Sequence, residues 1–164
     1  LDALAEFGAP EGRGLTLKLG PKRHPLLLVD ESYNATVASM NAALDLYKDA
    51  KAPAGKKVVV LGDMLEMGPQ GPLLHAGLAD AVLKSGVSHA YLVGPVMGAL
   101  ADELARRAGS DRDLAGVTHV QTVEEIGEPR FATLAYGDAV MVKGSKGVRL
   151  ASLVKTIRER FERA

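Results

Sequence analysis

The stretch Leu26-Leu27-Leu28-Val29-Asp30-Glu31-Ser32-Tyr33-Asn34-Ala35 joins a short apolar run directly to a polar loop. Three more apolar runs of strand length follow, each bounded by Gly, Pro or a charged residue, at 58–61, 91–93 and 140–142. Short continuous runs of this kind are typical of strands buried on both faces of a parallel sheet. Weaker patterns predict two further strands, at 15–19 and 118–120.

Amphipathic segments separate these runs, and apolar side chains recur in them at helical spacing. The four stripes are Met40, Ala43, Leu44 and Tyr47; Leu74, Leu78, Ala81 and Val82; Met97, Leu100, Ala101, Leu104, Ala105 and Ala108; and Leu150, Leu153, Val154, Ile157 and Phe161. Residues 122–136 are predicted as a further helix, interrupted at Gly127 and Pro129. Alternation of strands and helices predicts an α/β fold: a doubly wound, mostly parallel, Rossmann-like sheet with helices on both faces.

Residues 1–24 differ in character from the rest. Leu1–Phe7 reads as the tail of a helix, and Gly8–Gly14 is rich in turn formers. We interpret 1–24 as a hinge or connection from a preceding domain, with an edge strand at its end, and 25–164 as the α/β domain. The chain does not begin with Met, and we expect it to be a piece of a longer protein.

The composition argues against several kinds of function. Lys plus Arg and Asp plus Glu both number 20, so the balanced charge favours neither nucleic acid nor an anionic membrane. The absence of cysteine excludes disulfides, thiolate zinc sites and a Cys nucleophile. The histidines lack the spacing of a metal site, and His75, alone near the start of a helix, is interpreted as structural. No apolar run approaches the roughly 20 residues needed to cross a bilayer. With no signal peptide visible, we expect a cytoplasmic protein.

In an open parallel sheet, ligands bind beyond the carboxyl ends of the strands. This rule selects three polar loops, at 30–39, 62–68 and 143–147, which we expect to converge at one edge. A Lys directly after a buried strand and before Gly-Ser, as at Lys143, is placed to meet an anion at a helix N-terminus.

Most of these loop residues also have a purely structural alternative. Asp30 and Asp63 follow strands and can simply cap the next helix. Gly144 and Gly147 can simply supply positive φ angles in a tight turn.

The chain lacks a phosphate cradle of its own. A P-loop requires G-x-x-x-x-G-K-[ST], and Gly55-Lys56-Lys57 has neither the earlier Gly nor the hydroxyl residue. The dinucleotide fingerprint G-x-G-x-x-G after a strand is missing as well. We therefore expect the chain to form half of a site and to be inactive in phosphoryl transfer by itself.

Three ordered motifs resemble a known family. They are Asp30-Glu31-Ser32-Tyr33-Asn34-Ala35, Val60-Leu61-Gly62-Asp63-Met64-Leu65-Glu66-Met67-Gly68 and Val142-Lys143-Gly144-Ser145-Lys146, with His75 between the last two. They are similar to D-D-S-Y-N-A-N-P, V-L-G-D-M-x-E-L-G and V-K-G-S-R in the C-terminal domain of Mur ligases, the ATP-dependent amide-bond ligases of bacterial cell-wall synthesis. The resemblance is strongest to the branch that adds D-Ala-D-Ala, and it extends over about residues 10–160.

The resemblance implies a ligase of peptidoglycan biosynthesis, and thus a role in cell wall biogenesis, cell shape and cell division. An N-terminal domain would bind UDP-N-acetylmuramoyl-tripeptide, a central domain would carry the P-loop, and this domain would close over ATP. ATP phosphorylates the precursor's terminal carboxylate, and the amine of D-Ala-D-Ala attacks the acyl phosphate. Mg2+ held mainly by the central domain would offset the phosphate charge. The implied partners are these substrates and the two other domains, with no nucleic acid and no membrane insertion.

The resemblance also implies roles for single residues. Arg13 looks like a hinge arginine that reaches the ATP phosphates. The loop that matches the nucleotide-binding motif contains Asp30, Glu31, Tyr33 and Asn34. The residues that match loops facing the dipeptide are Asp63, Glu66, Lys143, Ser145 and Lys146. Lysine and serine suit the carboxylate of the dipeptide, and an acidic group suits its ammonium. No general base and no metal ligand is assigned in this domain.

Three departures from the family pattern leave the roles of the residues concerned open. Glu31 replaces Asp, Thr36-Val37 replaces Asn-Pro, and Lys146 replaces Arg, which gives up bidentate geometry. Alternatives are another Mur-type or folylpolyglutamate-type ligase domain, and a stand-alone nucleotide- or peptide-binding module without catalysis. A purely structural α/β domain is a third.

Overall fold

A computed structural model describes residues 12, 14–107, 114–126 and 134–162. Its centre is a six-stranded sheet of order β1-β2-β6-β3-β4-β5. The strands are β1 (Leu15–Leu19), β2 (Leu26–Glu31), β3 (Lys57–Gly62), β4 (His89–Val93), β5 (Gly116–Val120) and β6 (Ala139–Lys143). β1 pairs antiparallel with β2, and every other neighbouring pair is parallel. The predicted mostly parallel sheet is confirmed.

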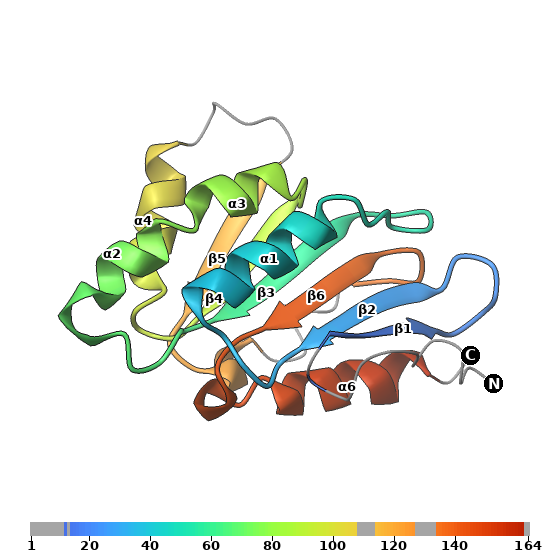
Figure 1. Ribbon diagram of the computed structural model, residues 1–164. Helices are drawn as coiled ribbons and strands as arrows, with labels where there is room; N and C mark the ends of the chain where they lie inside the picture. The colour runs from blue at the N-terminus through green and yellow to red at the C-terminus, as the bar shows by residue number, and fades with distance from the viewer. Residues whose placement is uncertain (1–11, 13, 108–113, 127–133, 163–164) are drawn as a thin grey trace.

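Helices cover both faces of this sheet, as predicted (Figure 1). One face carries α1 (Val37–Tyr47), α2 (Gly71–Ala76), α3 (Ala79–Lys84) and α4 (Gly98–Arg106), and the other carries α6 (Ala151–Phe161). Strand residues alternate between two apolar clusters because successive side chains point to opposite faces. Val58, Val60, Val140 and Val142 pack in the cluster that contains α6, whereas Val59, Leu61 and Met141 pack in the cluster that contains α1, α3 and α4.

The structure differs from the predicted helices in two places. The apolar stripe at 74–82 belongs to two short helices rather than one. Helix α2 ends at Ala76, and Gly77 and Leu78 lie between it and α3. Glycine disfavours a helix interior, and the break still leaves Leu78 fully buried. Within 122–136, a 3-10 turn at Val123–Glu125 is present, and 127–133 lies outside the described residues.

Side-chain hydrogen bonds hold both ends of α1. Thr36 forms a capping box with Ser39, in which each side chain accepts from the other residue's backbone N–H. At the other end, the ammonium of Lys57 donates to the carbonyl oxygens of Tyr47 (2.7 Å) and Ser85 (2.9 Å). One cation thus binds the C-terminal ends of both α1 and α3, where the helix dipoles favour positive charge.

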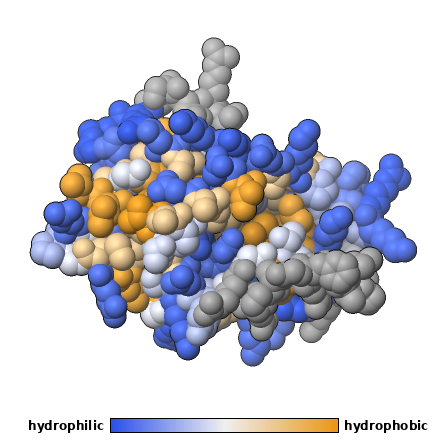
Figure 2. Space-filling view, viewed as in Figure 1, coloured by the Kyte–Doolittle hydropathy of each residue, from blue (hydrophilic) through white to orange (hydrophobic). Residues whose placement is uncertain are grey.

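The face with α1 to α4 is mixed in character. Figure 2 shows hydrophilic residues interspersed with apolar ones there, and the large exposed apolar side chains include Leu46 on α1 and Leu73 on α2. No helix in the described part of the chain has both the length and the apolar character that a membrane span requires.

The strand order places the carboxyl ends of β2, β6 and β3 side by side. The helices after β2 and β3 lie on one face of the sheet, and the helix after the intervening β6 lies on the other. Chain segments that leave adjacent strand ends toward opposite faces open a space between them, which is where doubly wound sheets bind ligands. The three predicted loops follow these three strands.

His89 makes the stability of this fold depend on pH. Its Nε2 lies 2.8 Å from the Thr118 hydroxyl, and burial lowers the pKa of His89 below its usual value. The unfolded chain therefore binds this proton more readily than the folded one, so stability is lost as pH falls below about 6.5 through the folded pKa. We expect His89→Gln to weaken the loss of stability between pH 7.5 and 5.5, measured by urea unfolding. An equal loss in both proteins would contradict this.

Candidate functional site

The three predicted loops converge, and Ser145 ties them together. The Ser145 hydroxyl accepts from the backbone N–H of Leu65 (3.0 Å) and donates to the carbonyl oxygen of Ala35 (3.5 Å). The N–H of Ser145 also donates to the carbonyl oxygen of Asp63 (3.3 Å). The loops after β2, β3 and β6 therefore form one connected edge, as expected from the strand order.

Close approach, and not positive φ, explains why glycine occupies position 144. Gly144 and Gly147 are not among the glycines with positive φ, so that expectation was wrong. A Cβ on Gly144 would lie 2.7 Å from Leu150 Cδ1 and 3.1 Å from Gly62 Cα. The left-handed residue of this segment is Arg149, with φ 67°.

Asp30 is a buried anchor for the loop after β2. It lies inside β2 rather than in a loop, because pairing with β6 continues to Glu31. One carboxylate oxygen accepts from Gly12 N–H (2.9 Å), and the other accepts from the N–H (3.0 Å) and hydroxyl (2.6 Å) of Ser32. Helix α1 is capped by Thr36, so the helix-capping alternative for Asp30 was wrong. Asp30 therefore joins Gly12, which precedes β1, to Ser32 in the loop after β2.

Glu31 and Lys143 form a pair across neighbouring strands. They stand opposite each other at the ends of β2 and β6, and Lys143 Nζ lies 3.5 Å from Glu31 Oε1. The ammonium also donates to the carbonyl oxygen of Asn34 (3.0 Å). Lys143 is only 3% exposed, and it is the last residue of its strand rather than the first of a loop. Its charge is satisfied within the domain.

Asp63 likewise uses its carboxylate inside the domain. Its two oxygens accept from the N–H groups of Val96 (3.2 Å) and Met97 (2.8 Å), directly before α4. Asp63 therefore does not cap the helix that follows it in the chain but binds the start of a neighbouring one. A Cβ on Gly94 (φ 119°) would meet this carboxylate at 2.4 Å, so the arrangement requires glycine there.

Other predicted side chains face solvent. Tyr33, Asn34, Glu66 and Lys146 are exposed, and Lys146 Nζ lies 5.2 Å from the centre of the Tyr33 ring. This distance is typical of a cation–π contact. Arg13 lies outside the described residues.

A groove of about 590 Å³ runs from this exposed pair along α6. Gly12, Asp30, Ser32, Tyr33 and Lys146 line one side, and the α6 residues Lys155, Arg158, Glu159 and Glu162 line the other. The groove thus offers an aromatic face with both cations and carboxylates beside it, and the backbone amides of Gly12 and Ser32 are already bonded to Asp30. Such a lining suits an aromatic ligand with polar substituents.

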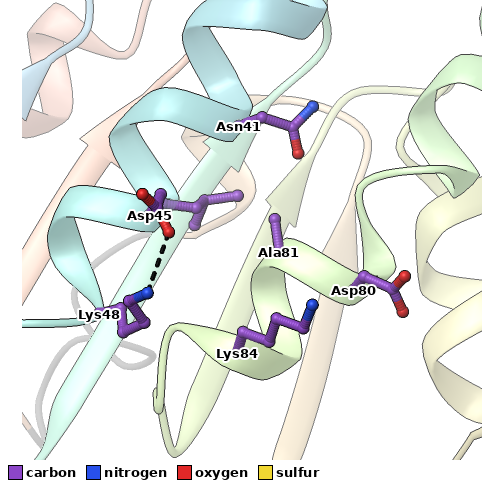
Figure 3. Close-up of a pocket in the computed structure, with 7 residues that line it drawn as sticks. Asn41, Asp45, Lys48, Asp80, Ala81 and Lys84 are labelled. Carbon is purple, nitrogen blue, oxygen red and sulfur yellow. Dashed lines mark ion pairs between the residues drawn. The ribbon is translucent and has the colours of Figure 1, made fainter.

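A second hollow, of about 300 Å³, lies between α1 and α3 (Figure 3). The side chains that surround it carry charges of both signs. Lys48 pairs with Asp45 at 3.1 Å, and Asp80 pairs with Arg107 outside the hollow. Because these charges are solvated and paired with each other, the strand-end edge is the better candidate site.

Within the described part of the chain, no three His, Asp or Glu side chains gather in a way that could hold a metal ion. The cations and amides of the edge are suited to binding anions instead.

Sequence reasoning named two further residues of this edge, and interpreted His75 as structural, but it did not assign their contacts. Ser32 holds Asp30, and His75 holds the loop after β3 through the backbone N–H of Met64. Ser32 bonds to a side chain two residues before it, whereas His75 bonds to a backbone group of another segment, which no sequence spacing shows. Burial of His75 at 0% exposure is visible only in the fold.

This architecture defines an α/β domain with a strand-end site made of three tied loops. Residues 18–146 match the family described as "Mur ligase, glutamate ligase domain". The chain is 30% identical over 151 residues to the UDP-N-acetylmuramoyl-tripeptide–D-alanyl-D-alanine ligase of Rickettsia prowazekii, covering 92% of this chain and 31% of the relative. It is 27% identical over 158 residues to the ligase of the same name from Bacillus subtilis, covering 96% and 34%.

Solved structures agree in fold. A MurF ligase from Thermotoga maritima in complex with ADP matches with a TM-score of 0.69 and 20% identity, over 95% of this chain and 32% of that one. A MurF from Acinetobacter baumannii matches with a TM-score of 0.73 and 24% identity, over 93% and 31%. The chain belongs to the Mur ligase family, as a domain of its C-terminal type. It spans about a third of the length of these relatives.

Removing the Ser145 hydroxyl should loosen the edge without unfolding it. We expect Ser145→Ala to lower the free energy of unfolding by about 1–2 kcal/mol, because the Leu65 N–H loses its acceptor. Hydrogen exchange at Leu65 should accelerate. Ser152→Ala is the matched control, because that exposed hydroxyl bonds only locally to the Arg149 carbonyl oxygen. Equal effects of the two substitutions would contradict a special role for Ser145.

Proposed function

We propose that the chain is the C-terminal domain of an ATP-dependent ligase that joins D-Ala-D-Ala to UDP-N-acetylmuramoyl-tripeptide. The observation that carries the proposal is the joined edge, in which the family's three motifs are brought together by Ser145. Relatives that carry this ligase name align along 92–96% of the chain. Because the chain spans about a third of them, the activity would belong to the longer protein.

The reaction has two steps. A carboxylate oxygen of the precursor attacks the γ-phosphorus of ATP, which forms an acyl phosphate and releases ADP. The amine of D-Ala-D-Ala then attacks the acyl carbon, phosphate leaves, and the amine loses a proton. The central domain would supply the P-loop and hold Mg2+, which offsets the phosphate charge. This domain would supply positioning, which is a large part of catalysis in such transfers.

On the nucleotide side, the exposed residues are the direct contacts. Tyr33 offers its ring face and Asn34 its amide to the base or ribose, while Lys146 adds a cation beside the ring. Asp30 and Glu31 already serve Ser32, Gly12 and Lys143, so we propose that they hold the loop that presents these groups. Arg13 would reach the phosphates. The Thermotoga maritima relative was crystallised with ADP, which supports a nucleotide as a ligand of the longer protein.

On the dipeptide side, Glu66 is the exposed acid and suits the ammonium of D-Ala-D-Ala. Ser145 and Lys146 are accessible at the same edge and suit its carboxylate. Lys143 and Asp63 are buried, at 3% exposure each. We propose that these two act by holding the loops, with Lys143 adding positive potential beneath the site.

Two rival functions make different predictions for the complete gene. A folylpolyglutamate-type or another Mur ligase would use the same domain architecture with a different acceptor amine, and substrate tests separate them. A stand-alone binding module would have a start codon close to Leu1. A ligase would have a P-loop about two hundred residues upstream, since a central domain of ordinary size must precede this one.

The isolated chain should be inactive. Because it lacks a P-loop, the 164-residue chain should release no phosphate from ATP and form no amide bond. The full-length protein should release phosphate when it is given UDP-N-acetylmuramoyl-tripeptide and D-Ala-D-Ala together, in a coupled phosphate-release assay. Substituting L-Glu or L-Lys for the dipeptide tests the other ligases. Amide formation by the isolated chain would overturn the proposed architecture.

Replacing Lys143 should impair turnover while leaving the protein folded. In the full-length protein, Lys143→Ala should lower kcat/KM for D-Ala-D-Ala at least about tenfold, equivalent to about 1.4 kcal/mol. It should also cost about 1–3 kcal/mol of stability, because Glu31 and the Asn34 carbonyl lose their partner. Lys18→Ala, at an exposed position of β1, is the control. Unchanged kinetics would show that Lys143 is a purely structural residue.

A further inference from the structure

His75 connects α2 to the loop after β3 through both ring nitrogens. Nδ1 lies 2.7 Å from the carbonyl oxygen of Gly71, and Nε2 lies 2.9 Å from the amide nitrogen of Met64. The side chain has no solvent exposure. A buried polar group that meets its hydrogen-bond partners is stabilising, and one that loses them is costly.

These partners determine the state of the ring. A carbonyl oxygen can only accept, and a backbone N–H can only donate. The proton must therefore lie on Nδ1, and the Nε2 lone pair must face Met64, so the ring is a neutral imidazole of one tautomer. His75 acts here as an acceptor that reaches a backbone amide from another element.

The bond to His75 is the middle one of three consecutive anchors. The N–H of Asp63 donates to the Val93 carbonyl oxygen (3.0 Å), and the N–H of Leu65 donates to the Ser145 hydroxyl (3.0 Å). Three successive backbone donors thus find acceptors on β4, on α2 and on the loop after β6. This arrangement leaves the loop little freedom to rotate.

The anchored segment ends at Glu66, whose backbone is in the left-handed region with φ 62°. This conformation is unfavourable for a non-glycine residue, so neighbouring contacts must hold it. The Glu66 side chain is exposed at the edge, beside a hollow of about 180 Å³ that Gly71 and Val96 also line. The direction of its carboxylate therefore depends on the anchors that precede it.

We propose that His75 is a positioning residue for the amine substrate: it holds the Met64 amide so that Glu66 meets the ammonium group of the incoming dipeptide. The inference rests on the proposed ligase function. The residues proposed for the base or ribose, Tyr33 and Asn34, belong to the loop after β2, whereas the bond to His75 lies in the loop after β3. We therefore expect this bond to matter more to the dipeptide than to the nucleotide. Selective loss of dipeptide binding is thus the signature that separates positioning from general stabilisation.

Two substitutions of His75 in the full-length protein test the proposal. His75→Leu fills the space but offers no acceptor, whereas the side-chain oxygen of His75→Gln can reach the position of Nε2. The KM for D-Ala-D-Ala should rise about tenfold in His75→Leu, since a misplaced charged contact is worth about 1.4 kcal/mol or more. The KM for ATP should stay within about twofold. His75→Gln should recover most of the loss.

Glu66→Gln shows whether His75 acts through Glu66. If it does, adding His75→Leu to Glu66→Gln should raise the KM for the dipeptide by less than about twofold further, because coupled residues are not additive. His89→Leu is the matched control, because this histidine lies at the opposite ends of the strands and bonds to Thr118. It should lower the unfolding temperature and leave both KM values unchanged.

Three results would overturn the proposal: equal changes in both KM values, a lowered unfolding temperature with normal kinetics, or no recovery in His75→Gln. Failure of the proposed function is recognised separately, as an absence of D-Ala-D-Ala-dependent phosphate release by the unmodified full-length protein. Hydrogen exchange then still tests the anchor, because the Met64 amide should exchange faster in His75→Leu than in His75→Gln. Equal exchange in the two variants would contradict it.

Discussion

The insertion of β6 between β2 and β3 is the constraint on which the rest of the structure depends. β6 hydrogen-bonds to both neighbours in parallel, and its last residue, Lys143, stands beside Glu31 on one side and Leu61 on the other. Strand residues separated by about a hundred positions in the chain therefore end at the same edge. Gly144 allows the next backbone segment to pass close to Gly62, and Ser145 then bonds to both flanking loops.

Three of the charged groups at this edge hold backbone groups in place. Asp30, Asp63 and Lys143 are each nearly completely buried, and each binds groups from another segment. An unpaired buried charge would be very costly, so these contacts make the loop conformations strongly preferred. The exposed groups are correspondingly few, and they are the ones available to a ligand. A site arranged in this way is organised before the ligand arrives, which reduces the entropy lost on binding.

The edge nevertheless has only some of the groups that phosphoryl transfer requires. Its three loops offer the ring of Tyr33, the amide of Asn34, the ammonium of Lys146 and the carboxylate of Glu66, but the sequence contains no P-loop. Phosphoryl transfer requires a cradle of backbone amides and a metal ion around the γ-phosphate. Under the proposed function, this domain of the Mur ligase family would complete a site that another domain begins.

The sequence by itself determined the elements and their order. Apolar runs and helical stripes identified the strands and the principal helices, and the alternation of the two predicted the parallel sheet. The helix prediction was wrong at 74–82, where the chain forms two helices separated at Gly77. The spacing of apolar residues does not by itself show where the backbone hydrogen bonds of a helix stop. The Gly-rich loop was also misread, since the requirement at Gly144 is close packing against a distant backbone.

Sequence motifs also selected the residues of the edge, but not what each of them does. Asp30, Asp63 and Lys143 have the same chemistry whether they face a ligand or a buried amide, and only burial and partners distinguish the two. His75 illustrates the limit best, because its acceptor role exists only where α2 packs against the loop after β3. Local spacing encodes secondary structure, whereas the contacts that orient this edge join residues distant in sequence. Their roles were decided by the tertiary fold.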